Sequence, residues 1–185
     1  MNRLRTATAA LHSRLELDLD LFEQVSRPQG RRRLVERFHG LHVGAERALA
    51  PFLSSLSGLE FEKRSRLVHL DHDLVALGGR LTDIPACPVA SPASLAEALG
   101  LFYVLEGSTL GGHVIRRQLT ARGVDAEGLS FLDPYGPEVG VRWRDFLAVL
   151  DRETPLEPAR DDAVAGAVTG FTLTHDWLCV PEAVS

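Results

Sequence analysis

The sequence predicts an all-α fold, because its apolar residues recur at helical spacing and capping residues separate the periodic segments. A further observation is that no run shows the alternating apolar and polar pattern of a half-buried strand. The 185 residues suit one domain built around one hydrophobic core. We therefore expect residues 1–185 to form a single-domain helical bundle of about six to eight helices.

The first two predicted helices meet near Ser26. The apolar stripe of the first helix fades before Ser26 and is formed by Leu4, Leu11 and Leu15. Ser26 and Gln29 stand at capping-box spacing with Pro28 in the first turn, so we expect Ser26 to begin the second helix. The apolar face of that helix is formed by Leu34, Phe38, Leu41, Ala45, Leu49 and Phe52.

The remaining helices follow from the same signals. A third helix is expected to end at a glycine pair, and its apolar face is formed by Leu67, Leu70, Leu74 and Leu77. A proline-rich connector at residues 82–93 leads to a long helix, which Ser94 and Glu97 open with another capping box and which ends near Gly123. Two further helices are predicted near residues 141–150 and 157–178.

The long predicted helix contains several glycines, although each mid-helix glycine costs roughly 1 kcal/mol relative to alanine. Gly100, Gly107 and Gly111 fall at i, i+7 and i+11, so one face of the helix lacks side chains. Two explanations are open: close packing of a neighbouring helix, or a flat ligand against the backbone. Such a ligand would find hydroxyls beside it and basic groups at its rim. The polar residues concerned are Ser108, Thr109, His113, Arg116 and Arg117.

A histidine in the first predicted helix is a candidate partner for the other face of such a ligand. Arg5, Ala9, His12 and Glu16 share one helix face. A neutral imidazole ligates iron through one nitrogen and needs an acceptor for the other, and Glu16 is one turn away from His12. The alternative is that His12 is an ordinary interfacial histidine and that Arg5 and Glu16 are plain surface charges.

Composition limits the classes of function. The chain has 25 acidic and 20 basic residues and a net charge of −5, which argues against broad binding of nucleic acid or an anionic membrane. We expect no apolar run long enough to span a bilayer and find no signal-peptide core at the N-terminus. Two cysteines, Cys87 and Cys179, are too few for a disulfide framework or a thiolate metal site. The cytoplasm is therefore the expected location.

Two segments together resemble the heme oxygenases, and most closely the bacterial branch that serves biliverdin-binding phytochromes. Residues 4–16 read L-R-x-A-T-x-x-L-H-x-x-L-E, which is similar to the proximal helix of the family. Residues 103–112 read YVLEGSTLGG, which is similar to its distal helix. Weaker likenesses are the R-W-R-x-F segment at residues 142–146 and the last helix, with Phe171 and Trp177. The implied fold is the all-α heme oxygenase bundle.

The resemblance implies roles for individual residues. His12 matches the proximal ligand of heme iron, and Glu16 matches the carboxylate that hydrogen-bonds it. Gly107 and Gly111 match the glycines that let the distal helix approach heme. Ser108 stands where animal members carry an aspartate that organises a water near the oxygen, so the holder of the distal water network is left open. The other implied heme contacts are Phe102 near the heme edge, Gly112 in the distal helix, and Arg5, Arg117 and Arg144 near the propionates.

The resemblance also implies a reaction and its partners. Heme would be both substrate and cofactor, and O2 together with electrons from a reductase or ferredoxin-type donor would open it at a meso carbon. The products would be biliverdin, carbon monoxide and ferrous iron. A bacteriophytochrome is the implied acceptor of biliverdin, whereas neither nucleic acid nor a membrane is an expected partner.

Three alternatives are weighed against this interpretation. A heme carrier or sensor of the same fold would bind heme without producing bilin. A di-iron bundle needs two E-x-x-H units, and Glu36 with His39 forms one. Thiamin-pathway helical hydrolases have a similar fold but need a cysteine nucleophile, and neither Cys87 nor Cys179 has an obvious base. Histidines such as His42 are interpreted as packing or surface residues.

Overall fold

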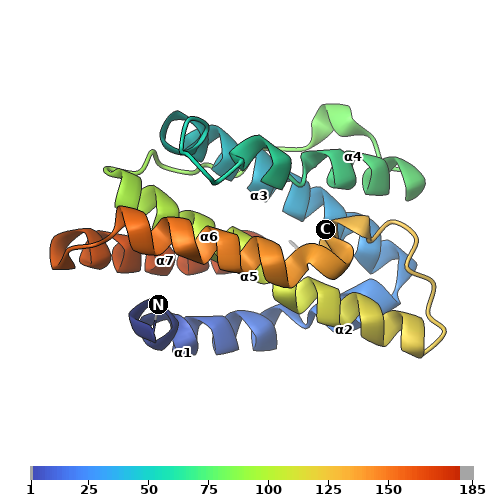
Figure 1. The fold of residues 1–185 in the computed structure, drawn as a ribbon. Coiled ribbons are helices and arrows are strands. Elements are labelled where there is room, and N and C mark those ends of the chain that lie inside the picture. Colours follow the sequence, from blue (N-terminus) through green and yellow to red (C-terminus); the bar gives the residue numbers. More distant parts are fainter. Residues whose placement is uncertain (1, 180–185) are drawn as a thin grey trace.

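The computed structural model describes residues 2–179 and contains seven α-helices and no strand within that range (Figure 1). The α-helices are α1 (Asn2–Leu19), α2 (Leu21–Ser26), α3 (Pro28–Leu53), α4 (Leu67–Ala76), α5 (Leu95–Ala121), α6 (Val139–Glu153) and α7 (Glu157–Leu178). Short 3-10 turns are η1 (Phe61–Arg64), η2 (Leu81–Asp83), η3 (Ser130–Leu132) and η4 (Gly136–Glu138). The prediction of an all-α fold is confirmed.

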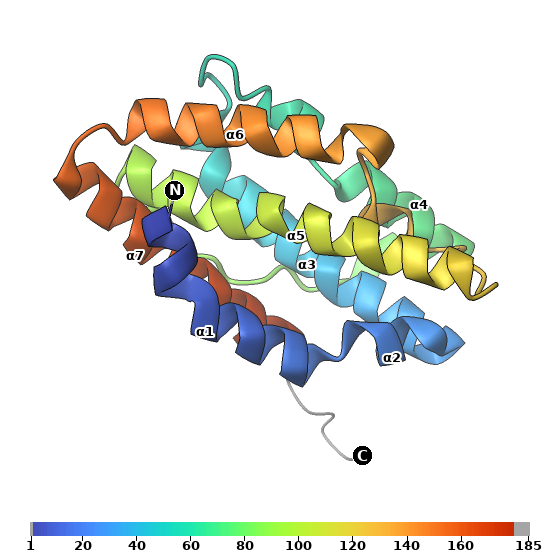
Figure 2. The same cartoon turned by 60° about the horizontal axis from the view of Figure 1, so that its bottom comes forward.

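The central helix of the bundle is α5, which α7 accompanies along much of its length (Figures 1 and 2). The helices α3 and α6 cover other sides of α5. The N-terminal helix α1 also packs against α7, but within the described residues it makes few direct contacts with α5. Both helices that carry the candidate residues therefore share α7 as their common neighbour.

By length and composition alone, α5 could cross a bilayer. The expectation that the chain lacks such a run is therefore wrong for residues 95–121. Within the fold, however, 56% of the relevant window is buried inside the protein, where it packs against α3, α6 and α7. The apolar composition of α5 is thus that of a core helix.

The two predicted capping boxes have different outcomes. Ser94 begins α5, because its Oγ accepts from the N–H of Glu97 at 3.1 Å while the Glu97 carboxylate accepts from the backbone N–H just before Ser94 at 2.6 Å. The prediction for Ser26 is wrong: it is the last residue of α2, and its hydroxyl donates to the Phe22 carbonyl at 2.8 Å. A serine bonded back into its own helix is unavailable as a cap for the next one.

Helix α1 is attached to α7 near both of its ends. At its start Arg3 forms ion pairs with two carboxylates of α7, and at its end Oδ2 of Asp18 lies 2.8 Å from Nε2 of His175. Exposed pairs of this kind stabilise a fold by at most about 1 kcal/mol each. The buried side chains of Leu4 and Leu19 therefore contribute much of the attachment.

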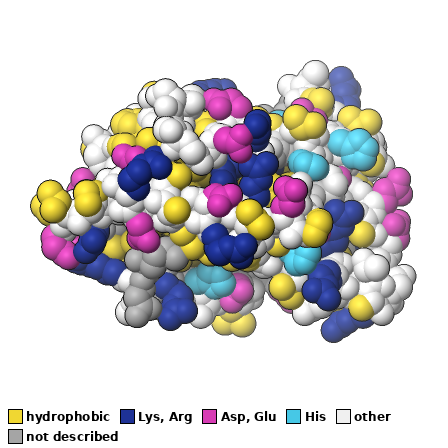
Figure 3. Space-filling view, in the orientation of Figure 1, with side chains coloured by type: hydrophobic (Ala, Val, Ile, Leu, Met, Phe, Trp, Pro, Cys, Tyr) yellow, Lys and Arg dark blue, Asp and Glu magenta, His cyan; other side chains and the backbone are white. Residues whose placement is uncertain are grey.

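The proline-rich connector at residues 82–93 lies against α3. The N–H of Cys87 donates to the carbonyl of Gly40 at 2.9 Å. A side chain at Gly40 or Gly44 would overlap the backbone of Pro85 or Cys87 respectively, so these glycines allow the connector to approach. On the molecular face of Figure 3, acidic and basic side chains are interspersed.

Candidate heme site

Two glycines of α5 are required for packing within the fold. A Cβ at Gly100 would overlap the backbone of Ala163 in α7, with the carbonyl carbon at 2.8 Å. A Cβ at Gly112 would overlap the backbone of Leu132 in η3, with the carbonyl carbon at 2.9 Å. Of the two explanations left open for the glycine face, close packing of a neighbouring helix therefore holds at Gly100, where α7 occupies the position. The heme contact predicted for Gly112 stays a prediction, beside the packing role that the structure gives it.

The two glycines between them are open. A Cβ at Gly111 would meet no atom within 4 Å, and a Cβ at Gly107 would make an ordinary contact with Cη2 of Trp143 at 3.4 Å. Neither glycine is required by the packing of the chain itself. They leave a stretch of helix backbone on which a flat molecule can lie, which is the feature that a heme site on α5 needs.

His12 lies on α1 with 56% of its side chain exposed. Its Nδ1 is 3.3 Å from Oε2 of Glu16, one turn further along the helix. Its ring meets the ring of Phe171 edge-on, with the centroids 5.6 Å apart. A proton on Nδ1 can be donated to Glu16, which leaves the lone pair of Nε2 for a metal ion. The residues present therefore fit an iron ligand at this position.

Helix α7 connects His12 with the open part of α5. A Cβ at Gly170 would lie 2.9 Å from Cγ2 of Val104, so α7 packs directly on α5 about one turn before Gly107. The next residue, Phe171, is the one whose ring meets His12. The imidazole and the turn of α5 that precedes Gly107 therefore adjoin the same short stretch of α7.

A row of aromatic side chains runs from the core to the open glycines. Phe102 is 3% exposed and packs between Phe61 and Phe146 at centroid distances of 5.4 and 5.5 Å. Phe146 contacts Trp143 at 5.6 Å, and Trp143 contacts Tyr103 at 5.2 Å. Phe102 thus supports Trp143, which adjoins Gly107, and its predicted place near the heme edge stays a prediction.

The three predicted propionate partners lie on different helices. Arg5 in α1 is close enough to Tyr103 for its charge to oppose the rise that burial causes in the pKa of the Tyr103 phenol. Arg5 therefore lies on the side of α1 that approaches α5. Arg117 is exposed near the end of α5, and Arg144 is exposed on α6 beside Gly140. The propionate contacts of these arginines stay predictions.

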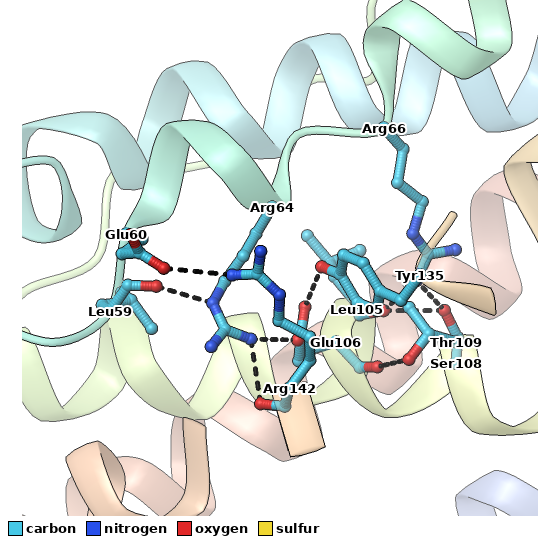
Figure 4. Close-up of polar contacts among 10 residues, drawn as sticks. All are labelled: Leu59, Glu60, Arg64, Arg66, Leu105, Glu106, Ser108, Thr109, Tyr135 and Arg142. Atoms are coloured by element: carbon cyan, nitrogen blue, oxygen red, sulfur yellow. Dashed lines mark hydrogen bonds and ion pairs between the residues drawn. The ribbon is translucent and has the colours of Figure 1, made fainter. Parts of the chain in front are cut away.

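The Ser108 hydroxyl is bonded to a buried arginine (Figure 4). Arg66, which directly precedes α4, is 3% exposed, and its Nη2 donates to Oγ of Ser108 at 2.7 Å and to the carbonyl of Leu105. Ser108 in turn donates to the Leu105 carbonyl at 2.7 Å. Burial lowers the pKa of the Arg66 guanidinium, and the charge of Glu106 opposes this shift. A charged donor therefore fixes the hydroxyl that follows Gly107.

A buried carboxylate, Glu106, lies beside this pair (Figure 4). Arg64 pairs with its Oε1, and the Tyr135 hydroxyl donates to its Oε2 at 3.0 Å. Burial raises the pKa of Glu106, while Arg64 and Arg66 act in the opposite direction. Burial and the adjacent carboxylate also raise the pKa of the Tyr135 phenol, so this hydroxyl is protonated and serves as a donor. Arg64 additionally donates from Nε to the Leu59 carbonyl at 2.6 Å.

This buried polar cluster was not predicted from the sequence. The sequence contains one indication of it: Glu106 is the single charged residue between positions 98 and 112, so a buried carboxylate could have been suspected there. Arg64 and Arg66 stand in a short charged segment that resembles an exposed loop, and Tyr135 stands in a turn. The convergence of these segments depends on the tertiary fold, and no local pattern indicates it.

The histidines outside α1 have partners of their own. His42 is buried with its Nδ1 3.0 Å from Glu46, and Nε2 of His39 is 2.9 Å from Asp71. The interpretation of His42 as a packing residue is confirmed. Among the described residues, no three His, Cys, Asp or Glu side chains are grouped as a metal site.

An imidazole on one helix and an open glycine face on another, held together by a third, define an all-α protein suited to a flat iron-containing ligand. A family model for heme oxygenase matches residues 1–179, and the chain belongs to the heme oxygenase family. A heme oxygenase from Xanthomonas campestris pv. campestris (strain 8004) is 37% identical over 163 residues, which cover 88% of this chain and 91% of that protein.

Membership of this family confirms the resemblance and identifies heme as the molecule that the chain binds. It supports an enzyme that degrades heme with biliverdin as product. The relative is bacterial, as the predicted branch is, and the link to a phytochrome stays a prediction. A carrier or sensor without turnover is not favoured.

Proposed function

We propose that this chain binds heme between α1 and α5, next to α7, and opens it at a meso carbon to biliverdin, carbon monoxide and ferrous iron. The observation that carries the proposal is the contrast among the α5 glycines. The space that a side chain would take is occupied by neighbouring backbone at Gly100 and Gly112, whereas it is open at Gly107 and Gly111. The open pair begins one turn beyond Val104, where α5 packs on the stretch of α7 that meets His12.

On the proximal side, we assign His12 as the iron ligand through Nε2. Glu16 accepts the Nδ1 proton and so selects the tautomer that ligates metal. The edge-on contact with Phe171 limits rotation of the imidazole ring. An uncharged imidazole donates less electron density than a thiolate, which suits a reaction that does not begin with O–O cleavage.

On the distal side, Gly107 and Gly111 allow the α5 backbone to lie against the ligand. When bound, heme supplies the redox-active iron and is itself the molecule that is oxidised. The Trp143 ring lies beside Gly107 and would form an apolar edge of the site there. Ser108 supplies a hydroxyl through which a proton can be held near the distal face, and Gly112 positions this part of α5 by its contact with Leu132.

At the rim, the proposed partners of the heme propionates are arginines. Arg5 approaches α5 from α1, Arg117 lies about 9 Å along the helix from Gly111, and Arg144 is on α6. Guanidinium groups suit carboxylates because they donate in a bidentate geometry. The orientation of heme in the site, and hence the meso carbon attacked, would depend on which arginines engage it. Phe102 is assigned an indirect role at the heme edge through the aromatic row.

The reaction needs partners, which we infer from the branch of the family. Electrons would come from a reductase or ferredoxin-type donor and O2 from solution. The product would pass to a bacteriophytochrome as its biliverdin chromophore. We propose that the protein acts in the cytoplasm as one domain spanning residues 1–185.

The test is an absorption time course of the protein mixed with one equivalent of hemin and then supplied with a reductant system under air. We expect a Soret band that decays while a broad bilin band grows in the red. His12→Ala should lose the Soret band of histidine-ligated heme, whereas His72→Ala, which alters a histidine whose side chain is 78% exposed on α4, should retain it. A stable Soret band without bilin would reject the enzyme in favour of a carrier.

A further inference from the structure

Arg66 connects three parts of the fold at a buried position. Its backbone N–H donates to Oε1 of Glu46 in α3 at 3.3 Å, while its guanidinium reaches the Leu105 carbonyl and the Ser108 hydroxyl in α5. Glu46 is in turn held by His42 at 3.0 Å and by the Ser65 hydroxyl at 2.6 Å. Glu46 thus holds the backbone of Arg66, while the guanidinium is bonded to the distal part of α5 (Figure 4).

The Ser108 hydroxyl forms one hydrogen bond within its own helix and one with Arg66 outside that helix. It donates to the Leu105 carbonyl at 2.7 Å and accepts from Arg66 at 2.7 Å. The single proton of this hydroxyl is thus donated to Leu105, the two bonds together fix its rotamer, and its second lone pair can still accept from a water at the open glycines. Ser108 is exposed and directly follows the open Gly107, so a molecule at the open glycines can reach the same hydroxyl.

A small cavity lined by both polar and apolar side chains adjoins Arg66. It has a volume of about 10 Å³, and its polar lining comes from His42, Glu46, Arg64, Ser65, Arg66 and Glu106. This volume suits one water molecule, which needs two to four polar partners. Nε2 of His42 is buried and has no hydrogen-bond partner among the described residues, so it is a suitable partner for that water.

We infer that Arg66 is the positioning residue for the distal hydroxyl of Ser108, and that one buried water joins His42 to this arginine cluster. The inference rests on the proposed heme site. A hydroxyl held by a buried guanidinium would order the distal water at the position where other members of the family carry an acid. It would also place positive charge behind the distal face, which favours deprotonation of a water bound there.

The experiment follows the alkaline transition of the ferric heme complex, seen as the pH-dependent change of its Soret and visible bands. We expect Arg66→Gln to move this transition upward by about half a pH unit or more, because the Ser108 hydroxyl loses the charged donor that holds it. Ser108→Ala should move it in the same direction, and the double variant should move it no further, since Arg66 acts through Ser108. Arg66→Lys should restore part of the shift because it retains the charge.

The matched control is Arg64→Gln. Arg64 is 4% exposed, compared with 3% for Arg66, and pairs with Glu106 without contacting Ser108. Both arginine variants should lower the unfolding midpoint of the heme-free protein, because each removes a partner from the buried cluster. Only the Arg66 variant should move the alkaline transition. An equal shift in both variants, or none in Arg66→Gln and Ser108→Ala, would overturn the positioning role.

Heme binding and bilin formation by the wild-type protein distinguish a failure of this inference from a failure of the proposed function. If the wild type forms a Soret complex and bilin while Ser108→Ala and Arg66→Gln keep the wild-type transition, the inference fails and the function stands. A wild type without a Soret complex defeats both. A crystal structure of the heme-free protein should show an ordered water within hydrogen-bonding distance of Nε2 of His42, and an empty cavity there would contradict the water.

Discussion

Replacing the two adjacent glycines of α5 should change stability in opposite directions. Gly111→Ala gains helix propensity of about 0.5–1 kcal/mol, and nothing within 4 Å of its Cβ opposes that gain. The heme-free variant should therefore unfold about 2–4 °C higher for a gain near 1 kcal/mol. Gly112→Ala gains the same propensity but forces its Cβ against the Leu132 backbone, whose carbonyl carbon is 2.9 Å away. Such overpacking costs about 1–3 kcal/mol, so this variant should unfold lower.

The same position can be tested for the ligand. Gly111→Leu should match the stability of Gly111→Ala without heme, because the added atoms extend into open space. Its hemin affinity, measured by Soret titration, should fall at least about tenfold, which corresponds to 1.4 kcal/mol. If Gly111→Ala and Gly112→Ala are equally destabilised, Gly111 is a packing residue. Undiminished hemin affinity in Gly111→Leu would show that heme lies elsewhere.

Three further predictions concern single side chains. His12→Ala should change the stability of the heme-free protein by less than about 1.5 kcal/mol in urea unfolding, because it removes only the edge-on contact with Phe171 and the exposed pair with Glu16. The same variant should lose the Soret spectrum of histidine-ligated heme. Burial lowers the pKa of His42 below the 6.5 of an ordinary imidazole, so the fold should lose stability as the pH falls below 6.5. In the wild type this pH dependence of the free energy of unfolding is up to about 1.4 kcal/mol per pH unit, and His42→Gln should remove it. The measurement compares urea unfolding of the wild type and the variant at several pH values. Ser94→Ala should lower the thermal midpoint by about 2–4 °C through loss of roughly 1 kcal/mol at the start of α5, and an unchanged midpoint would show that the cap is dispensable.

Much of the fold was predictable because helical periodicity and caps are local. The long helices lie where the apolar stripes predicted them, and Ser94 caps α5 as expected. The prediction for Ser26 was wrong because this residue can either cap α3 or end α2. Which of the two occurs depends on the path of the chain at Asp20. There the backbone takes a left-handed conformation with φ of 39°, which separates α1 from α2. A local motif does not contain that information.

The candidate site was predictable only in part, for a related reason. The spacing of Gly100, Gly107 and Gly111 indicated a bare face, but the sequence could not say which glycine meets a neighbouring helix. That distinction is set by α7, whose Ala163 backbone fills the position beside Gly100. Likewise, Arg66 reaches Ser108 across 42 positions of the chain. Long-range contacts of this kind require the assembled fold.

The buried polar cluster accounts for how a glycine-rich helix can serve as a rigid surface. Glycines weaken α5 near the site, because they increase the conformational freedom that folding must overcome. Arg66, through Leu105 and Ser108, and Arg64, through Glu106, fix three residues of α5 on both sides of Gly107. A buried ion pair adds little net stability once desolvation is counted, so its larger effect here is to determine where the helix lies. The open side of α5 can thus lack side chains while the residues flanking Gly107 fix the backbone, and a flat ligand meets a surface that is already in place.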